Sequence, residues 1–225
     1  MKRLALFLAI ASIVSNPALA QISQNEALQL LKQGNARFVN GKPTSPHRDM
    51  KRIKEVANGQ NPFAVIVGCS DSRVANEILF DQGLGDLFVV RTAGQVSTEA
   101  SWGSIEFAVK SLGANLIVVL GHTKCGAVTA AAGPGVADGH IKFLVDSIKP
   151  AVAIARKMPG DILDNAVKQN ISLQVEKLKH LDPILAPKVT NGSVKIVGAL
   201  YHIETGEVEF LETVTSPVAA KKDGK

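Results

Sequence analysis

The sequence has few cysteines and few aromatic residues, which argues against two classes of protein, dithiol redox proteins and nucleic-acid-binding proteins. Its 225 residues include only two cysteines, and aromatic side chains make up 4% of the chain. The two cysteines do not form a Cys-x-x-Cys pair, which argues against a dithiol redox protein. Basic residues are scattered and aromatic residues are few, so we expect no nucleic-acid partner. The chain also shows no internal repeat and no linker that would divide it.

Residues 1–20 have the pattern of a secretory signal peptide: a basic start, an apolar run at residues 4–14 and small residues at 18–20. The alternative is a buried N-terminal helix. The run is shorter than the roughly 20 apolar residues that a helix needs to cross a bilayer, so we expect no membrane anchor. Cleavage near Ala20 would give a periplasmic or secreted protein. It would also lower the formal net charge from +5 to +3, since two basic residues are removed.

Strand-like and helix-like segments alternate along the rest of the chain. This order predicts a single α/β domain at residues 21–215, with a mostly parallel sheet flanked by helices. Residues 216–225 are small and charged without periodicity, which predicts a disordered tail. The expected strands are residues 63–67, 87–91, 116–120 and 194–200, with 208–211 at an edge. The expected helices are residues 24–40, 98–112, 125–132, 140–157 and 161–181.

Each cysteine lies in a polar cluster directly after an apolar, strand-like run. Cys69 follows residues 64–68, and His122 and Cys125 follow a run that begins at Leu116. Side chains at the carboxyl ends of parallel strands face the crevice in which such sheets bind small molecules. Two thiolates and one imidazole make a zinc site with one position left for water, as in catalytic sites, whereas structural zinc has four protein ligands.

A disulfide between Cys69 and Cys125 is the rival interpretation, because export favours disulfides. A disulfide gives no reason for the ligand-type residues that surround both cysteines. Zinc lowers the pKa of a coordinated water from about 15.7 toward about 7, which favours hydration or hydrolysis. Oxidoreduction would need a cofactor, and the glycines of residues 133–139 lack the strand and helix context of a dinucleotide-binding motif.

Asp71 and Arg73 follow the first cysteine and are two residues apart. A guanidinium at this spacing can hold the carboxylate in a two-pronged pair. The carboxylate could then orient the water on the metal, or it could itself take the fourth zinc position in a closed, resting site. A third interpretation is that the pair only braces the turn.

Six motifs, taken together and in this order, resemble the β-class carbonic anhydrases. They lie at residues 31–38, 69–74, 81–94, 106–109, 121–128 and 198–201. The resemblance implies reversible hydration of CO2 to bicarbonate and a proton. It also implies one Zn²⁺ per subunit, held by Cys69, His122 and Cys125, with Asp71 and Arg73 as the dyad that keeps the site open or closed.

The resemblance further implies a homodimer or tetramer. In this family an N-terminal helical arm packs on a neighbouring subunit, and the active-site cleft lies at the subunit interface. Gln60 matches a position whose amide contacts substrate, and Phe88 and Phe107 match positions of the apolar pocket. Gly126 matches the position after the last cysteine, beside the substrate.

The sequence departs from the family pattern at two positions. Phe107 stands where plant-type members have tyrosine, so a hydroxyl is absent while the apolar bulk is kept. Gln95 stands where asparagine is common. Ile66 replaces the tryptophan of members that have an inhibitory bicarbonate site, so we expect no such site here and, with Gln60, an open zinc. Hydrolysis of CS2 or COS and a non-catalytic zinc protein are the competing functions.

Overall fold

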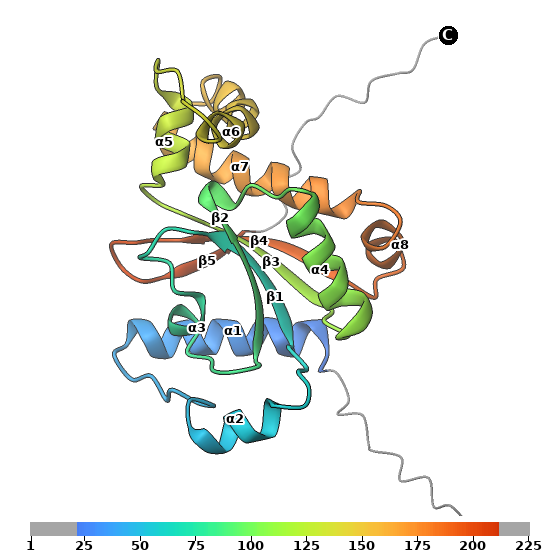
Figure 1. Ribbon diagram of the computed structural model, residues 1–225. Coiled ribbons are helices and arrows are strands. Elements are labelled where there is room, and N and C mark those ends of the chain that lie inside the picture. The colour runs from blue at the N-terminus through green and yellow to red at the C-terminus, as the bar shows by residue number, and fades with distance from the viewer. Residues whose placement is uncertain (1–21, 212–225) are drawn as a thin grey trace, which may run out of the picture.

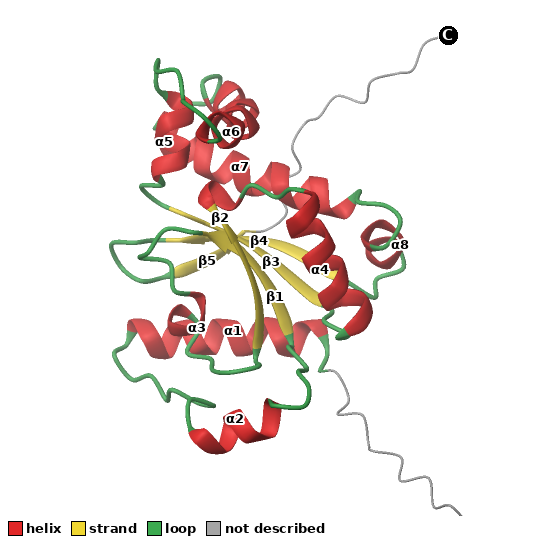
Figure 2. Ribbon diagram, viewed as in Figure 1, coloured by secondary structure: helices red, strands yellow, loops and turns green. Residues whose placement is uncertain are grey.

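The computed structural model describes residues 22–211, which fold around a five-stranded sheet (Figures 1 and 2). The strand order is β2-β1-β3-β4-β5, and only β5 runs antiparallel to its neighbour. The strands are β1 (Ala64–Cys69), β2 (Leu87–Thr92), β3 (Leu116–His122), β4 (Lys195–Tyr201) and β5 (Val208–Leu211). The predicted α/β class and the edge position of β5 are confirmed. The expected signal peptide and tail lie outside the described residues.

Helices cover both faces of the sheet (Figure 1). The apolar side chains of α1 and α3 pack on one face, and those of α4 to α8 pack on the other. The helices are α1 (Gln24–Val39), α2 (Met50–Val56), α3 (Asn76–Leu79), α4 (Glu99–Ser111), α5 (Gly126–Ala132), α6 (Ile141–Ala155), α7 (Ile162–Lys179) and α8 (Leu185–Thr190), with a 3₁₀ turn, η1, at Ala93–Gln95. Every residue of β1 and β3 is therefore buried, as their continuous apolar sequences predict.

The five predicted helices are present, and three short ones were missed. α2 buries none of its residues, so no apolar periodicity marks it. α3 has a single turn of four residues, and α8 contains Pro187 within its first turn. Such short helices form because tertiary contacts hold them, and local sequence is a poor guide to them. No helix within residues 22–211 has the length and apolar character needed to cross a bilayer.

Gly121 makes room for a helix to pack on the sheet. It lies inside β3, where a side-chain Cβ would come within 2.6 Å of Ile171 on α7. Gly198 on the neighbouring strand β4 meets the same side chain, at 2.7 Å. The two glycines let α7 approach the sheet closely. The left-handed residue of the following turn is Lys124, with φ +52°.

Helix α1 packs on the sheet of its own chain. Ala27 and Leu31 are fully buried against that face. The Asn35 amide donates to the carbonyl oxygens of Leu79 (3.1 Å) and Gly206 (2.9 Å), which fixes the helix in place. The apolar face of α1 is thus used within the chain, and packing of the arm on a neighbouring subunit stays a prediction.

Asp81 fastens the segment after α1 to the domain. Its fully buried carboxylate accepts hydrogen bonds from Arg37 Nε (2.6 Å) and from the backbone N–H groups of Thr44 (2.9 Å) and Ser45 (2.8 Å). Burial raises the pKa of this carboxyl, but the bonds from Arg37, Thr44 and Ser45 outweigh burial and lower the pKa to about 2. The carboxylate is therefore charged at neutral pH and stabilises the fold in that form.

Replacing Asp81 with asparagine is expected to lower the free energy of unfolding by about 2–4 kcal/mol at pH 7, because buried donors lose a charged acceptor. The carboxyl titrates at about 2 in the folded chain, below its ordinary value of 3.8. Its stabilising effect is complete above about pH 5 and is lost as the pH falls toward 2. Urea unfolding of both proteins should show a stability difference that shrinks over that range. A difference that stays constant with pH would contradict this assignment.

Candidate metal centre and active site

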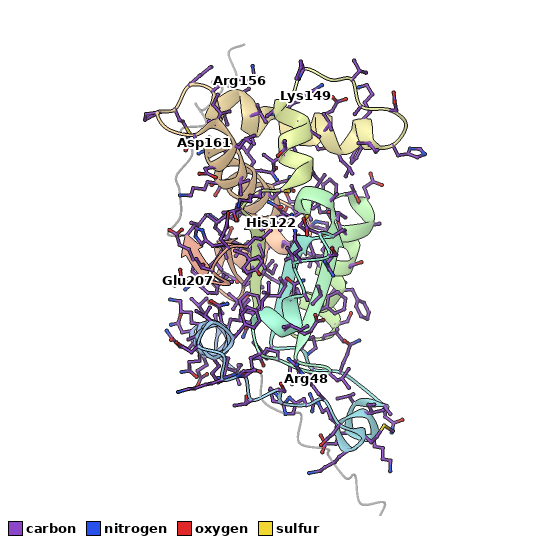
Figure 3. The ribbon with its side chains drawn as sticks, turned by 90° about the vertical axis from the view of Figure 1, so that its left-hand side faces the viewer. Arg48, His122, Lys149, Arg156, Asp161 and Glu207 are labelled. Atoms are coloured by element: carbon purple, nitrogen blue, oxygen red, sulfur yellow. The ribbon has the colours of Figure 1, made fainter. Side chains whose placement is uncertain are left out.

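Three ligand-type side chains meet at the carboxyl ends of β1 and β3. Cys69 is the last residue of β1, His122 is the last residue of β3, and Cys125 is the N-cap of α5. One ligand atom from each residue lies within 4.8 Å of the other two, and all three residues are buried. Figure 3 shows His122 in the middle of the molecule, between the sheet and the helices above it. Both cysteines are free thiols, so the geometry does not support the rival disulfide.

The imidazole of His122 is oriented for metal binding. Its Nδ1–H donates to the carbonyl oxygen of Thr123 at 2.8 Å. Since a carbonyl oxygen only accepts, we infer that Nδ1 carries a proton, which leaves Nε2 as the ring nitrogen available to a metal ion. Nε2 is buried and makes no hydrogen bond within the described chain. A buried nitrogen of this kind needs a partner, and a metal ion beside two cysteine sulfurs provides one.

The two sulfurs favour a positive charge between them. The hydrogen bond with Cys125 lowers the pKa of the Cys69 thiol below its ordinary value, against the opposing effect of burial. The same contact and burial raise the pKa of Cys125. The two sulfurs are therefore in hydrogen-bonding contact, and two negative charges this close together repel each other. A soft cation such as Zn²⁺ in that place would let both sulfurs ionise, so the donor set fits zinc.

Backbone groups complete the surroundings of Cys69. Its Sγ accepts hydrogen bonds from the N–H of Gly94 (3.2 Å) and, more weakly, from that of Asp71 (3.4 Å). Gly94 is held in turn by Asn170 of α7, whose amide donates to the Gly94 carbonyl at 2.8 Å. These bonds stabilise a thiolate at the end of β1. The contribution of Asn170 was not predicted, because 76 residues separate it from Gly94.

Asp71 and Arg73 form the expected two-pronged pair. Arg73 Nε donates to Asp71 Oδ1 at 2.9 Å, and Arg73 Nη2 donates to Oδ2 at 2.7 Å. The pair lies beside the metal ligands, since Asp71 Oδ2 is 3.8 Å from His122 Nε2. The hydrogen bonds from Arg73 hold the pKa of the Asp71 carboxyl well below its usual range, although partial burial opposes them. Asp71 is therefore an ionised acceptor at the edge of the cluster.

Arg91 is a further residue of the site that the sequence did not reveal. Its guanidinium donates to the carbonyl oxygens of Cys69 (2.9 Å) and Asp71 (2.7 Å). It thereby braces the backbone that carries both a ligand and the acidic residue. The available signal was a single charged side chain within the apolar run of β2.

A single chain does not bring the predicted substrate contacts to this cluster, with the exception of Gly126, the first residue of α5. Gln60 is exposed and precedes β1, whose six residues span about 16 Å. Phe88 pairs with Val65, which lies about 13 Å before the end of β1. Phe107 is 51% exposed and lies about 12 Å along α4 from its start. These three assignments stay predictions that require a second subunit.

Comparison with known proteins identifies the family. The family model described as carbonic anhydrase matches residues 64–208. The chain is 45% identical over 188 residues to a carbonic anhydrase of Mycolicibacterium smegmatis, covering 82% of this chain and 91% of the relative. It is 43% identical over 187 residues to carbonic anhydrase 2 of Mycobacterium tuberculosis, covering 80% and 89% of the two chains.

Solved structures support the same family assignment. The β-carbonic anhydrase CcaA matches with a TM-score of 0.65 and 27% identity, over 82% of this chain and 95% of that one. The chain therefore belongs to the carbonic anhydrase family, and its fold and its Cys-His-Cys site are those of the β class. It is an enzyme that catalyses the reversible hydration of CO2 to bicarbonate and a proton.

Proposed function

We propose that Cys69, His122 and Cys125 hold one zinc ion per subunit and that Asp71 and Arg73 govern access to it. The observation that carries this proposal is the buried cluster of Cys69, His122 and Cys125, whose ligand atoms lie within 4.8 Å of one another and in which Nε2 of His122 makes no hydrogen bond within the described chain. Zn²⁺, when bound, supplies the Lewis acidity that makes water a nucleophile at neutral pH. The protein residues orient the attacking water, supply charged groups beside it and form an apolar pocket for CO2.

Asp71 orients the attacking water in this proposal. An ionised carboxylate accepts a hydrogen bond from water, and the two bonds from Arg73 fix the direction in which its remaining lone pairs point. While Arg73 engages both oxygens, Asp71 stays off the metal and the site stays open. A crystal structure at neutral pH with Asp71 bound to zinc would overturn the open arrangement.

The active unit is a homo-oligomer, a dimer or a tetramer, in which one subunit completes the pocket of another. Support comes from the sheet geometry, since Gln60, Phe88 and Phe107 lie too far from Cys69 of their own chain to contact its substrate. A twofold arrangement brings such residues to a neighbour's site and the neighbour's residues to theirs. The arm of residues 22–56 would strengthen this contact through exposed side chains of α2, among them Met50 and Ile53.

Subunit mixing tests this arrangement. Gln60→Leu and Asp71→Asn homo-oligomers should each hydrate CO2 slowly. Mixed dimers carrying one copy of each variant, isolated with two affinity tags, should regain about half of the unchanged activity, because one of the two sites is then intact. If Gln60 acts within its own chain, the mixed dimers will be no faster than the average of the two variants.

We also propose that the protein is exported and loses residues 1–20. The support is the order of basic, apolar and small residues at the start of the chain. N-terminal sequencing of the protein isolated from its own cells should begin at Gln21, in the periplasmic or culture fraction. Protein that retains Met1 in the cytosolic fraction would contradict export.

A further inference from the structure

The turn that carries two of the three metal ligands is fastened to a second turn of the protein. Thr123 and Lys124 connect His122 to Cys125, and residues 202–207 connect β4 to β5. Both turns lie at the same end of the sheet, next to the carboxyl ends of β3 and β4 (Figure 1). The contacts between the two turns take no part in the chemistry described above, yet they connect to groups that surround His122.

Thr123 joins the imidazole of His122 to the β4–β5 turn. Its carbonyl oxygen accepts the Nδ1–H bond that fixes the orientation of His122. Its hydroxyl donates to Glu204 Oε2 at 2.8 Å and accepts from the N–H of Ile203 at 3.0 Å. The hydroxyl bonds to this turn, together with the N–H of Thr123, which donates to the carbonyl oxygen of Tyr201 at 3.0 Å, therefore fix the position of the Thr123 carbonyl.

Glu204 also holds the residue that follows. Its second oxygen, Oε1, pairs with Lys124 Nζ at 2.7 Å. Lys124 has φ +52°, a left-handed conformation that is strained for a residue with a side chain and persists only where surrounding contacts enforce it. One carboxylate thus restrains both residues between His122 and Cys125.

We propose that Glu204 and Thr123 are positioning residues for the metal centre. Glu204 holds the Thr123 hydroxyl and the Lys124 side chain, and the Thr123 carbonyl then keeps Nε2 of His122 aimed between the two cysteine sulfurs. The outer partner of a metal-ligating histidine normally tunes affinity in this way, and its loss costs about 10–100-fold. This inference rests on the proposed zinc site.

The location of Glu204 allows a clean test. Its side chain is exposed, and Thr123, Lys124 and Glu204 all line a surface pocket of about 520 Å³. Removal of the carboxylate therefore leaves no cavity in the core. Glu207 of the same turn is also exposed, and within residues 22–211 its carboxylate has only a 3.5 Å contact with Thr205. Glu207→Ala is thus a matched control.

The experiment measures the affinity of the purified full-length protein for zinc by competition with a colorimetric chelator. Thr123→Val should weaken zinc binding about 10–100-fold, since the valine has the shape of threonine without its hydroxyl. Glu204→Ala should weaken it about tenfold. Thr123→Ser, which keeps the hydroxyl, and Glu207→Ala should bind zinc as the unchanged protein does. The absorption bands of Co²⁺-substituted protein should shift only in the first two variants.

Equal zinc affinities and equal cobalt spectra across all four variants would overturn the proposal. So would a loss in Thr123→Ser as large as that in Thr123→Val, because the hydroxyl would then not be the cause. Thermal unfolding of the metal-free proteins separates a general loss of stability from a change at the site. If the unchanged protein binds no zinc, the proposed zinc site itself has failed.

Discussion

Cys125→Ser protein should contain much less than one zinc per subunit and should lose about a thousandfold in kcat/KM for CO2 hydration. A factor of this size follows because metal assistance is worth several kcal/mol, and about 4 kcal/mol corresponds to a thousandfold in rate. Cys125 is only 3% exposed. Serine has nearly the size of cysteine, so it fills the same buried space but provides no thiolate. Metal analysis and stopped-flow hydration on the same sample measure both quantities.

The control for this variant is the unchanged protein after removal of zinc by a chelator. It should be as inactive as Cys125→Ser and should recover when zinc is added, whereas the variant should not recover at equal zinc. A Cys125→Ser protein with full zinc and full activity would show that Cys125 is not a ligand.

Asp71→Asn protein is expected to keep its zinc and to lose about a hundredfold in kcat/KM. Acid–base and orienting groups that are held in position contribute about 10²–10⁴ in rate. The amide that replaces the carboxylate is a poorer hydrogen-bond acceptor, and its NH₂ group is a donor that faces the donor groups of Arg73. Retained metal is expected because Asp71 holds Arg73 in the structure and is not one of the three clustered ligands. The effect should therefore separate rate from metal content.

Asp146→Asn is the matched control, because Asp146 is a carboxylate in an ion pair with Lys149 on α6 and lies outside the cluster. Its rate should equal that of the unchanged protein. Loss of zinc in Asp71→Asn at the same level as in Cys125→Ser would assign Asp71 to the metal itself, as in the closed site.

Local sequence predicted the parts of the molecule in which neighbours along the chain decide the structure. The continuous apolar runs of β1 and β3 identified both strands, and the polar residues directly after them identified the ligands. The spacing of Asp71 and Arg73 predicted their pairing, because two residues of a turn can meet without help from the rest of the fold.

Long-range contacts account for what local sequence could not show. No residue near Gly121 in the sequence reveals that Ile171 of α7 packs against it. Asn170 and Arg91 act on the site through backbone groups remote from them in sequence, so their side chains gave no signal of a role. The predicted roles of Gln60 and Phe107 are not met within one chain, and no pattern within one chain can locate a second subunit.

Stopped-flow CO2 hydration by the zinc-loaded, unchanged protein tests the central claim most directly. Between pH 7 and 9, protein containing one zinc per subunit should accelerate hydration, and the acceleration should disappear on zinc removal and return on its addition. Fully zinc-loaded, folded protein with no activity across that range would contradict the account.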